Sequence, residues 1–139
     1  LLSVWDQLSH ALPAFIGRGQ TVWLTGHSLG AAIANLAAAE LLARQCVKTI
    51  SGLYTFGEPR AGNADFSAWF NQLLKPRTFR FVNDNDIVQH VPPPALAYRH
   101  NGVFLHFDAQ QRLQTDESVW DDLKDALCLA ASKIWCTTA

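Results

Sequence analysis

The sequence has 139 residues, of which 49% are hydrophobic, and its formal net charge at pH 7 is −1. This length predicts one domain, and the hydrophobic content is high enough for a buried core. The near-neutral charge and the scattered Lys and Arg residues argue against a nucleic-acid-binding surface. The apolar runs are too short and interrupted for a transmembrane helix, and no signal-peptide pattern occurs. Cys46, Cys128 and Cys136 show no metal-binding spacing and leave the redox compartment undecided.

The first residues have the pattern of an amphipathic helix. Apolar residues at positions 1, 4, 5, 8 and 12 recur with helical spacing, and Pro13 marks the expected end of this helix. The sequence contains no methionine, and it begins in the middle of a helical pattern. We therefore expect the chain to start inside a larger domain.

The next segments alternate between strand and helix patterns. Residues 21–25 are β-rich and mostly apolar, as in a strand of a sheet that is covered on both faces. Residues 29–44 are apolar nearly all round, which is typical of a buried helix. A second strand is expected at 49–56, and the turn-forming residues 57–63 follow it as a loop.

The alternation continues to the end of the chain. Asn63 is the expected N-cap of a helix that Pro76 ends, and a third strand follows at 78–82. Residues 102–108 fit either one arm of a hairpin or an edge strand, and apolar residues with helical period predict a helix over 116–135. Strand and helix patterns that alternate in this way predict an α/β fold with a parallel sheet.

The most informative motif is Gly-His-Ser-Leu-Gly at 26–30, between the first strand and the helix that follows. A Gly-x-Ser-x-Gly sequence in this position predicts a sharp turn that exposes the hydroxyl of Ser28 above the sheet. Gly26 and Gly30 would let the strand and the helix approach closely. The N–H of Leu29, at the start of the helix, is the expected first donor to an oxyanion.

A serine nucleophile needs a general base and a carboxylate that orients the base. In this kind of fold the chain order is Ser, then Asp or Glu, then His. Asp84 and Asp86 both follow the strand at 78–82, and either could be an ordinary solvated turn residue. The residue pattern alone does not separate them.

Three blocks, GHSLGAAIA, YTFGEPRAGN (54–63) and NDIVQHVPP (85–93), together resemble the class 3 lipases, the fungal-type triacylglycerol lipase family. The resemblance covers roughly residues 1–108. It implies an α/β-hydrolase fold with central parallel strands and flanking helices, incomplete at both ends, in which 1–139 form one partial domain. It also implies hydrolysis of carboxylic esters, acylglycerols above all, with a lipid or ester substrate at a lipid–water interface. The implied mechanism needs no metal or organic cofactor.

Carried over by position, the resemblance makes Ser28 the nucleophile and Asp86, rather than Asp84, the acid of the triad. His27, directly before the nucleophile, is expected to be structural. Gly57, Pro59 and Gly62 in the second block are expected to shape a loop near the site and to take no part in the chemistry.

The chain departs from the family pattern at the histidine. The family places its catalytic histidine near the C-terminus in a His-x-x-Tyr context, which does not occur here. For each of the five histidines we expect a structural or surface role; they are His10, His27, His90, His100 and His106. The base is therefore expected beyond residue 139 or in residues absent from this chain, and a second oxyanion donor and a lid are expected upstream of Leu1.

Two other interpretations stay open at this stage. One keeps the enzyme class and changes the substrate, to that of a phospholipase, a feruloyl esterase or another carboxylesterase. The other is a non-catalytic, hydrolase-like remnant that acts as a binding module. The sequence does not indicate acyl-chain length, oligomeric state or compartment.

Overall fold

The computed structural model describes residues 2–16 and 20–115, and the helix predicted over 116–135 lies outside these residues, as do Cys128 and Cys136. The described residues form a five-stranded sheet in the order β1-β2-β4-β6-β7 and a two-stranded sheet of β3 and β5. The strands are β1 (Trp23–His27), β2 (Gly52–Phe56), β3 (Gly62–Asn63), β4 (Thr78–Asn83), β5 (Tyr98–Arg99), β6 (Val103–Phe107) and β7 (Leu113–Gln114). The first four strands of the large sheet run parallel, and β7 pairs antiparallel with β6.

The predicted α/β architecture with a parallel sheet is therefore confirmed. Of the two alternatives for residues 102–108 the hairpin arm is correct, because β6 pairs with β4 on one side and with β7 on the other. The predicted strands begin two or three residues early at β1 and β2, whereas β4 begins at the predicted residue.

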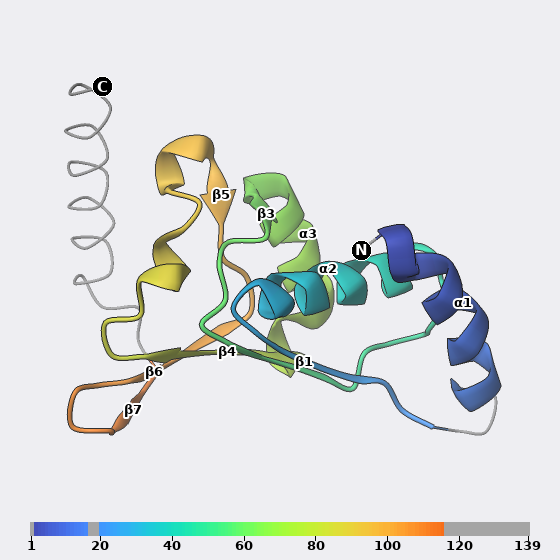
Figure 1. Cartoon of the computed structure of the whole chain (residues 1–139), viewed down its shortest axis with the longest axis horizontal. Helices are drawn as coiled ribbons and strands as arrows, with labels where there is room; N and C mark the ends of the chain where they lie inside the picture. The colour runs from blue at the N-terminus through green and yellow to red at the C-terminus, as the bar shows by residue number, and fades with distance from the viewer. Residues whose placement is uncertain (1, 17–19, 116–139) are drawn as a thin grey trace.

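The helices and 3-10 turns lie mainly on one side of the large sheet (Figure 1). The helices are α1 (Leu2–Ile16), α2 (Leu29–Ala43) and α3 (Ala64–Leu74), and the 3-10 turns are η1 (Lys75–Arg77), η2 (Ile87–His90) and η3 (Pro94–Leu96). Asn63 caps α3 as predicted, since its side chain accepts a hydrogen bond from the N–H of Phe66 at 2.9 Å. A buried cluster joins α1, α2, α3 and β2, and it includes Trp5, Ala38, Ile50, Leu53 and Phe70.

Two expectations about the helices were wrong. Helix α1 continues past Pro13 to Ile16, because Leu12 and Ile16 pack against the core and proline has a φ angle that a helix accepts. Helix α2 is not buried all round in the described part of the chain. Its alanine-rich side is buried against the sheet, whereas Leu29, Ile33 and Leu36 form an exposed stripe.

The other face of the large sheet carries a row of stacked aromatic rings that runs across four strands. Its members are Trp23, Tyr54, Phe56, Phe79, Phe81 and Phe107. Trp23 is 60% exposed and Phe56 is 43% exposed, so no described segment covers this face there. The expectation that the first strand is covered on both faces is thus wrong for the described residues, among which β1 is also an edge strand. Within these residues, no helix has the length and apolar character needed to cross a bilayer.

Candidate active site

The carboxyl ends of β1, β2 and β4 lie side by side at one edge of the sheet, and polar or flexible residues follow each of them. Backbone hydrogen bonds hold these three strand ends in register. They run from Ser28 N–H to the Phe56 carbonyl at 2.9 Å, from Gly57 N–H to Phe81 at 2.9 Å, and from Asp84 N–H to Phe107 at 2.7 Å. The residues that directly follow the strands are therefore adjacent in space, although they are far apart in sequence.

Ser28 occupies a sharp bend between β1 and α2. Its φ and ψ angles are 53° and −128°, a conformation that costs free energy for any residue with a side chain. The hydroxyl is not used to cap α2, so it remains available for other contacts. The N–H of Leu29 is at the first position of the helix, where no helical carbonyl can accept it, and the positive end of the helix dipole lies there.

The two glycines around the bend differ in their surroundings. A Cβ atom on Gly26 would collide with the backbone of Gly30 and lie 2.7 Å from the Cα of Ala31. Gly26 is therefore required for the close approach of strand and helix, as predicted. A Cβ on Gly30 would meet no described atom within 4 Å. The expectation that Gly30 must also lack a side chain is wrong for the described residues, because its side-chain direction points away from the strand.

The carboxylate of Asp86 lies against the end of β2. A Cβ atom on Gly57 would sit 2.5 Å from Oδ2 of Asp86 and 3.9 Å from Nε2 of His27, so both side chains lie close to this glycine. Gly57 has a φ of 56°, which confirms its predicted role in shaping the loop. The other carboxylate oxygen of Asp86 accepts a hydrogen bond from the N–H of Val88 at 2.9 Å. These contacts hold the carboxylate at the strand edge that also carries Ser28.

Asp84 is placed differently. Its φ angle is 38°, its Oδ2 accepts a hydrogen bond from the side chain of Asn85 at 3.0 Å, and its carbonyl oxygen lies 3.2 Å from Nε2 of His106. Among residues 2–16 and 20–115, the side chain of Asp84 is thus bonded to its neighbour in the turn. This geometry favours a turn role for Asp84 and leaves Asp86 as the better candidate for the acid.

The histidines make local contacts. Nε2 of His100 lies 2.7 Å from the carbonyl oxygen of Gln89, and burial, together with the positive charge of Arg80, holds the pKa of His100 well below its usual value. His106 stacks on Phe104, and Nδ1 of His10 lies 2.6 Å from the carbonyl oxygen of Asp6. These contacts fit structural roles.

Arg60, which the sequence analysis did not single out, joins two of the motif blocks. Its guanidinium donates to the carbonyl oxygens of His90 and Pro92, both at 2.8 Å, and its backbone N–H donates to the carbonyl of Val91 at 2.8 Å. The side chain is 7% exposed. It fixes the segment after Asp86 to the loop after β2. An arginine between turn-forming residues was the one signal that could have drawn attention to it.

A second missed feature is a buried polar network. The side chain of Asn35 on α2 donates to Oε1 of Glu58 at 2.8 Å and to Oδ1 of Asn101 at 2.6 Å, and all three residues are at most 4% exposed. Burial raises the pKa of Glu58 to about 7, against the opposing effects of the nearby hydroxyl of Thr55, the charge of Arg80 and the hydrogen bond from Asn35. A buried, protonatable carboxyl therefore lies directly after Gly57.

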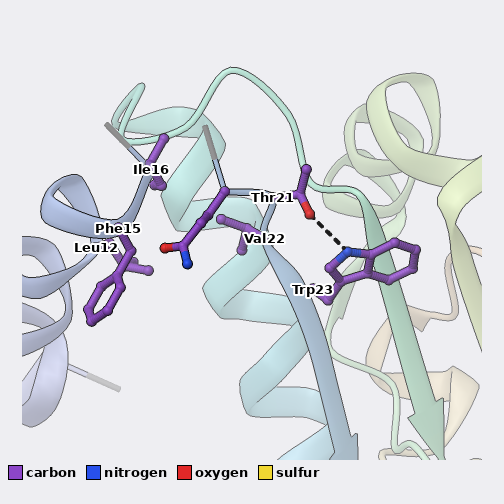
Figure 2. Close-up of a pocket in the computed structure, with 7 residues that line it drawn as sticks. Leu12, Phe15, Ile16, Thr21, Val22 and Trp23 are labelled. Carbon is purple, nitrogen blue, oxygen red and sulfur yellow. Dashed lines mark hydrogen bonds between the residues drawn. The ribbon is translucent and has the colours of Figure 1, made fainter. Parts of the chain in front are cut away.

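A pocket of about 540 Å³ lies at the opposite end of the sheet (Figure 2). Side chains from α1 and from the segment that leads into β1 line it: Leu12, Phe15, Ile16, Gln20, Thr21, Val22 and Trp23. The indole N–H of Trp23 donates to the hydroxyl of Thr21 at 3.1 Å. The pocket precedes β1, whereas Ser28 follows it, so this pocket is not part of the serine site. In the described parts of the chain no cluster of residues is suited to hold a metal ion.

Comparison with known proteins identifies the family of the chain. The chain matches the family described as Lipase (class 3) over residues 1–96, and it belongs to this family. It is 42% identical over 91 residues to Lipase ZK262.3 of Caenorhabditis elegans, an alignment that covers 63% of this chain and 25% of the relative. It is also 42% identical over 83 residues to the lipase of Rhizomucor miehei, covering 58% of this chain and 23% of the relative.

Among solved structures, the chain resembles a triacylglycerol lipase whose catalytic centre is formed by a serine protease triad. The TM-score is 0.71 at 30% identity, and the match covers 85% of this chain and 49% of that one. The fold is therefore the α/β-hydrolase fold. The chain spans about half the length of this solved lipase and about a quarter of the curated relatives that it matches.

Proposed function

We propose that the protein is a serine hydrolase of carboxylic esters, and most specifically a triacylglycerol lipase, in which Ser28 is the nucleophile and Asp86 is the acid of a Ser-Asp-His triad. Residues 1–139 form one part of its single α/β-hydrolase domain. The observation that carries the proposal is the strained bend at Ser28, which lies at the same strand edge as the carboxylate of Asp86. Class 3 lipase membership and similarity to a triad-containing triacylglycerol lipase support it.

The mechanism has two acyl-transfer steps. Ser28 attacks the ester carbonyl while a histidine accepts its proton, and Asp86 orients this histidine and stabilises its charged form. We expect the base to be a histidine other than the five in this sequence. His10 and His27 precede the serine in chain order, and the rings of His100 and His106 contact backbone carbonyls. His90 is buried. The N–H of Leu29 and one donor outside this chain bind the oxyanion. The alcohol then leaves, and water releases the fatty acid from the acyl-enzyme.

Exposed apolar side chains near the site favour a lipid substrate. Leu29 directly follows the nucleophile and is 69% exposed, and Ile87 directly follows the acid and is 74% exposed. Val91 and Leu96, on the loops that follow, are also exposed. Apolar groups gathered around a reactive serine are suited to acyl chains and to a lipid–water interface.

The test is ester hydrolysis by the complete protein with p-nitrophenyl esters of increasing chain length and with emulsified triacylglycerol. We expect turnover that Ser28→Ala abolishes, with higher rates on emulsified triacylglycerol than on phospholipid. A preference for phospholipid or for aryl esters would keep the serine-hydrolase mechanism and replace the lipase assignment. Turnover that Ser28→Ala leaves unchanged, or a complete protein without esterase activity, would favour the non-catalytic alternative.

A further inference from the structure

We infer that the buried hydrogen bond between Asn35 and Glu58 positions the nucleophile relative to the acid, so that Asn35 and Glu58 are positioning residues for the ester hydrolysis proposed above. The inference rests on the assignment of Ser28 and Asp86 to that reaction. Neither positioning residue touches the substrate. Each is connected to one of the two reacting groups through a short and rigid piece of backbone.

The first connection runs along α2. Asn35 is seven residues after Ser28, which is two helical turns, so both residues lie on the same side of the helix, about 10 Å apart along its axis. A helix of this length transmits a displacement of its second turn to its first residue. Anchoring Asn35 therefore fixes where α2, and with it the N-terminal bend at Ser28, lies over β1 and β2.

The second connection runs through the loop after β2. Glu58 directly follows Gly57, and the Cα of Gly57 lies against the carboxylate of Asp86 closely enough that a Cβ would sit 2.5 Å from Oδ2. A shift of Glu58 therefore also moves Gly57, which contacts the carboxylate of Asp86. The bond of 2.8 Å between Asn35 and Glu58 joins these two connections at a fully buried point.

The side-chain amide of Asn35 makes three hydrogen bonds, and both of its N–H groups are used. Its Nδ2 donates to Glu58 and to Asn101, and its Oδ1 accepts from Asn101 at 3.2 Å. Asn101 lies two residues before the start of β6. The network therefore also connects α2 to β6. Losing one member leaves buried polar groups without partners, which favours a shift of the helix or the loop.

Small displacements at this point have large kinetic effects, because catalysis depends on the spacing of the reacting groups to within about 1 Å. In the complete protein we expect Asn35→Ala and Glu58→Ala each to lower kcat about tenfold or more, with KM changed less than about twofold. Glu58→Gln keeps an oxygen that accepts from Asn35 and should retain kcat within about twofold.

The matched control is Ser67→Ala. Ser67 is also buried, at 7% exposed, and its hydroxyl donates to the carbonyl of His100 at 2.6 Å, but it lies on α3 and contacts neither connection. This variant should lose thermal stability and keep kcat. If Asn35 and Glu58 had only a structural role, their variants would behave like Ser67→Ala, with lower thermal stability and unchanged kcat.

The inference is overturned if folded Asn35→Ala and Glu58→Ala keep kcat within twofold of wild type, or if Ser67→Ala lowers kcat equally. If the single variants do not fold, the triple variant Asn35→Leu, Glu58→Leu and Asn101→Leu removes all three buried polar side chains of the network and is judged by the same kcat criterion. Ser28→Ala is measured in parallel. Loss of activity in Ser28→Ala without an effect in the network variants overturns this inference alone, whereas activity that survives Ser28→Ala overturns the proposed function.

Discussion

The two ends of the same three strands differ in backbone conformation. At the carboxyl ends of β1, β2 and β4, the next residue has a positive φ in every case: 53° at Ser28, 56° at Gly57 and 38° at Asp84. The residues that precede these strands have ordinary φ values, and the amino end of β1 lies beside the pocket lined by α1. Positive φ angles on this sheet are thus concentrated at the end where the proposed nucleophile and acid lie, and they are absent from the residues that precede the same three strands.

The largest expected effect on kcat is the difference between replacing Asp86 and replacing Asp84. We expect Asp86→Asn to lower kcat about 10³- to 10⁴-fold, because the base loses its orienting charge. The replacement keeps an oxygen that can accept from the N–H of Val88, so the fold should be preserved. Asp84→Asn should change kcat less than about threefold, since asparagine tolerates positive φ. Steady-state kinetics and circular dichroism check both, and equal losses would contradict the assignment of the acid.

A second comparison uses glycines at the two ends of β2. Gly57→Ala should lower kcat about ten- to a hundredfold, because a Cβ would collide with Asp86 and the φ of 56° disfavours alanine. At Gly52 a Cβ would meet the rings of Trp23 and Tyr54, of which Trp23 is 60% exposed and can shift toward solvent. Gly52→Ala should therefore affect stability and leave kcat within about twofold. A loss of kcat at Gly52 that matches the loss at Gly57 would show that the two ends are not distinct.

The buried carboxyl gives a third prediction, on stability. Since the pKa of Glu58 is raised from 4.5 to about 7, the folded protein binds this proton more tightly than the unfolded chain. The stabilisation is fully present below pH 4.5 and is lost as the pH rises to about 7. The stabilisation amounts to at most about 3 kcal/mol. Arg80 is the charged group that acts on this carboxyl, and its positive charge opposes the rise in pKa.

Urea unfolding at pH 5 and pH 8 measures this effect. The free energy of unfolding of wild type, relative to Glu58→Gln, should be larger at pH 5 than at pH 8. Asp108 does not interfere, because its hydrogen bonds to Arg112 and the turn lower its pKa to about 2. An identical pH dependence in the two proteins would show that Glu58 is charged throughout this range.

The smallest effect is expected at the pocket end. The ring of Trp23 stacks on Tyr54 with centroids 6.0 Å apart, but most of its surface is exposed. Trp23→Leu should lower stability by about 0.5–1.5 kcal/mol, the amount that such a ring pair contributes, and leave kcat within about twofold. Thermal unfolding and ester hydrolysis measure both values. A tenfold loss of kcat would show that this end of the sheet affects catalysis.

The sequence was sufficient for features that depend on local pattern. The strand–serine–helix junction, the cap at Asn63 and the parallel sheet follow from spacing and from turn-forming residues. Pro13 misled the prediction because the burial of Leu12 and Ile16 outweighs the local preference of proline. The exposed stripe of α2 was missed because an almost entirely apolar helix has no periodicity that would mark a second face.

Contacts between distant segments could not be read from the sequence. The choice between Asp86 and Asp84 depends on which carboxylate lies against Gly57, and residue pattern carries no information on that point. The bond between Asn35 and Glu58 joins positions 23 residues apart, and each residue alone resembles an ordinary surface polar group. Only the register of β2 beside β1 and the position of α2 over both strands bring them together.

The most direct test of Ser28 as the nucleophile is covalent labelling of the complete protein with an alkyl fluorophosphonate, followed by peptide mass spectrometry. We expect one modified residue, Ser28, with labelling that is slowed strongly in Asp86→Asn and little changed in Asp84→Asn. Modification of another serine, or a wild-type protein that remains unlabelled while it hydrolyses esters, would contradict this assignment.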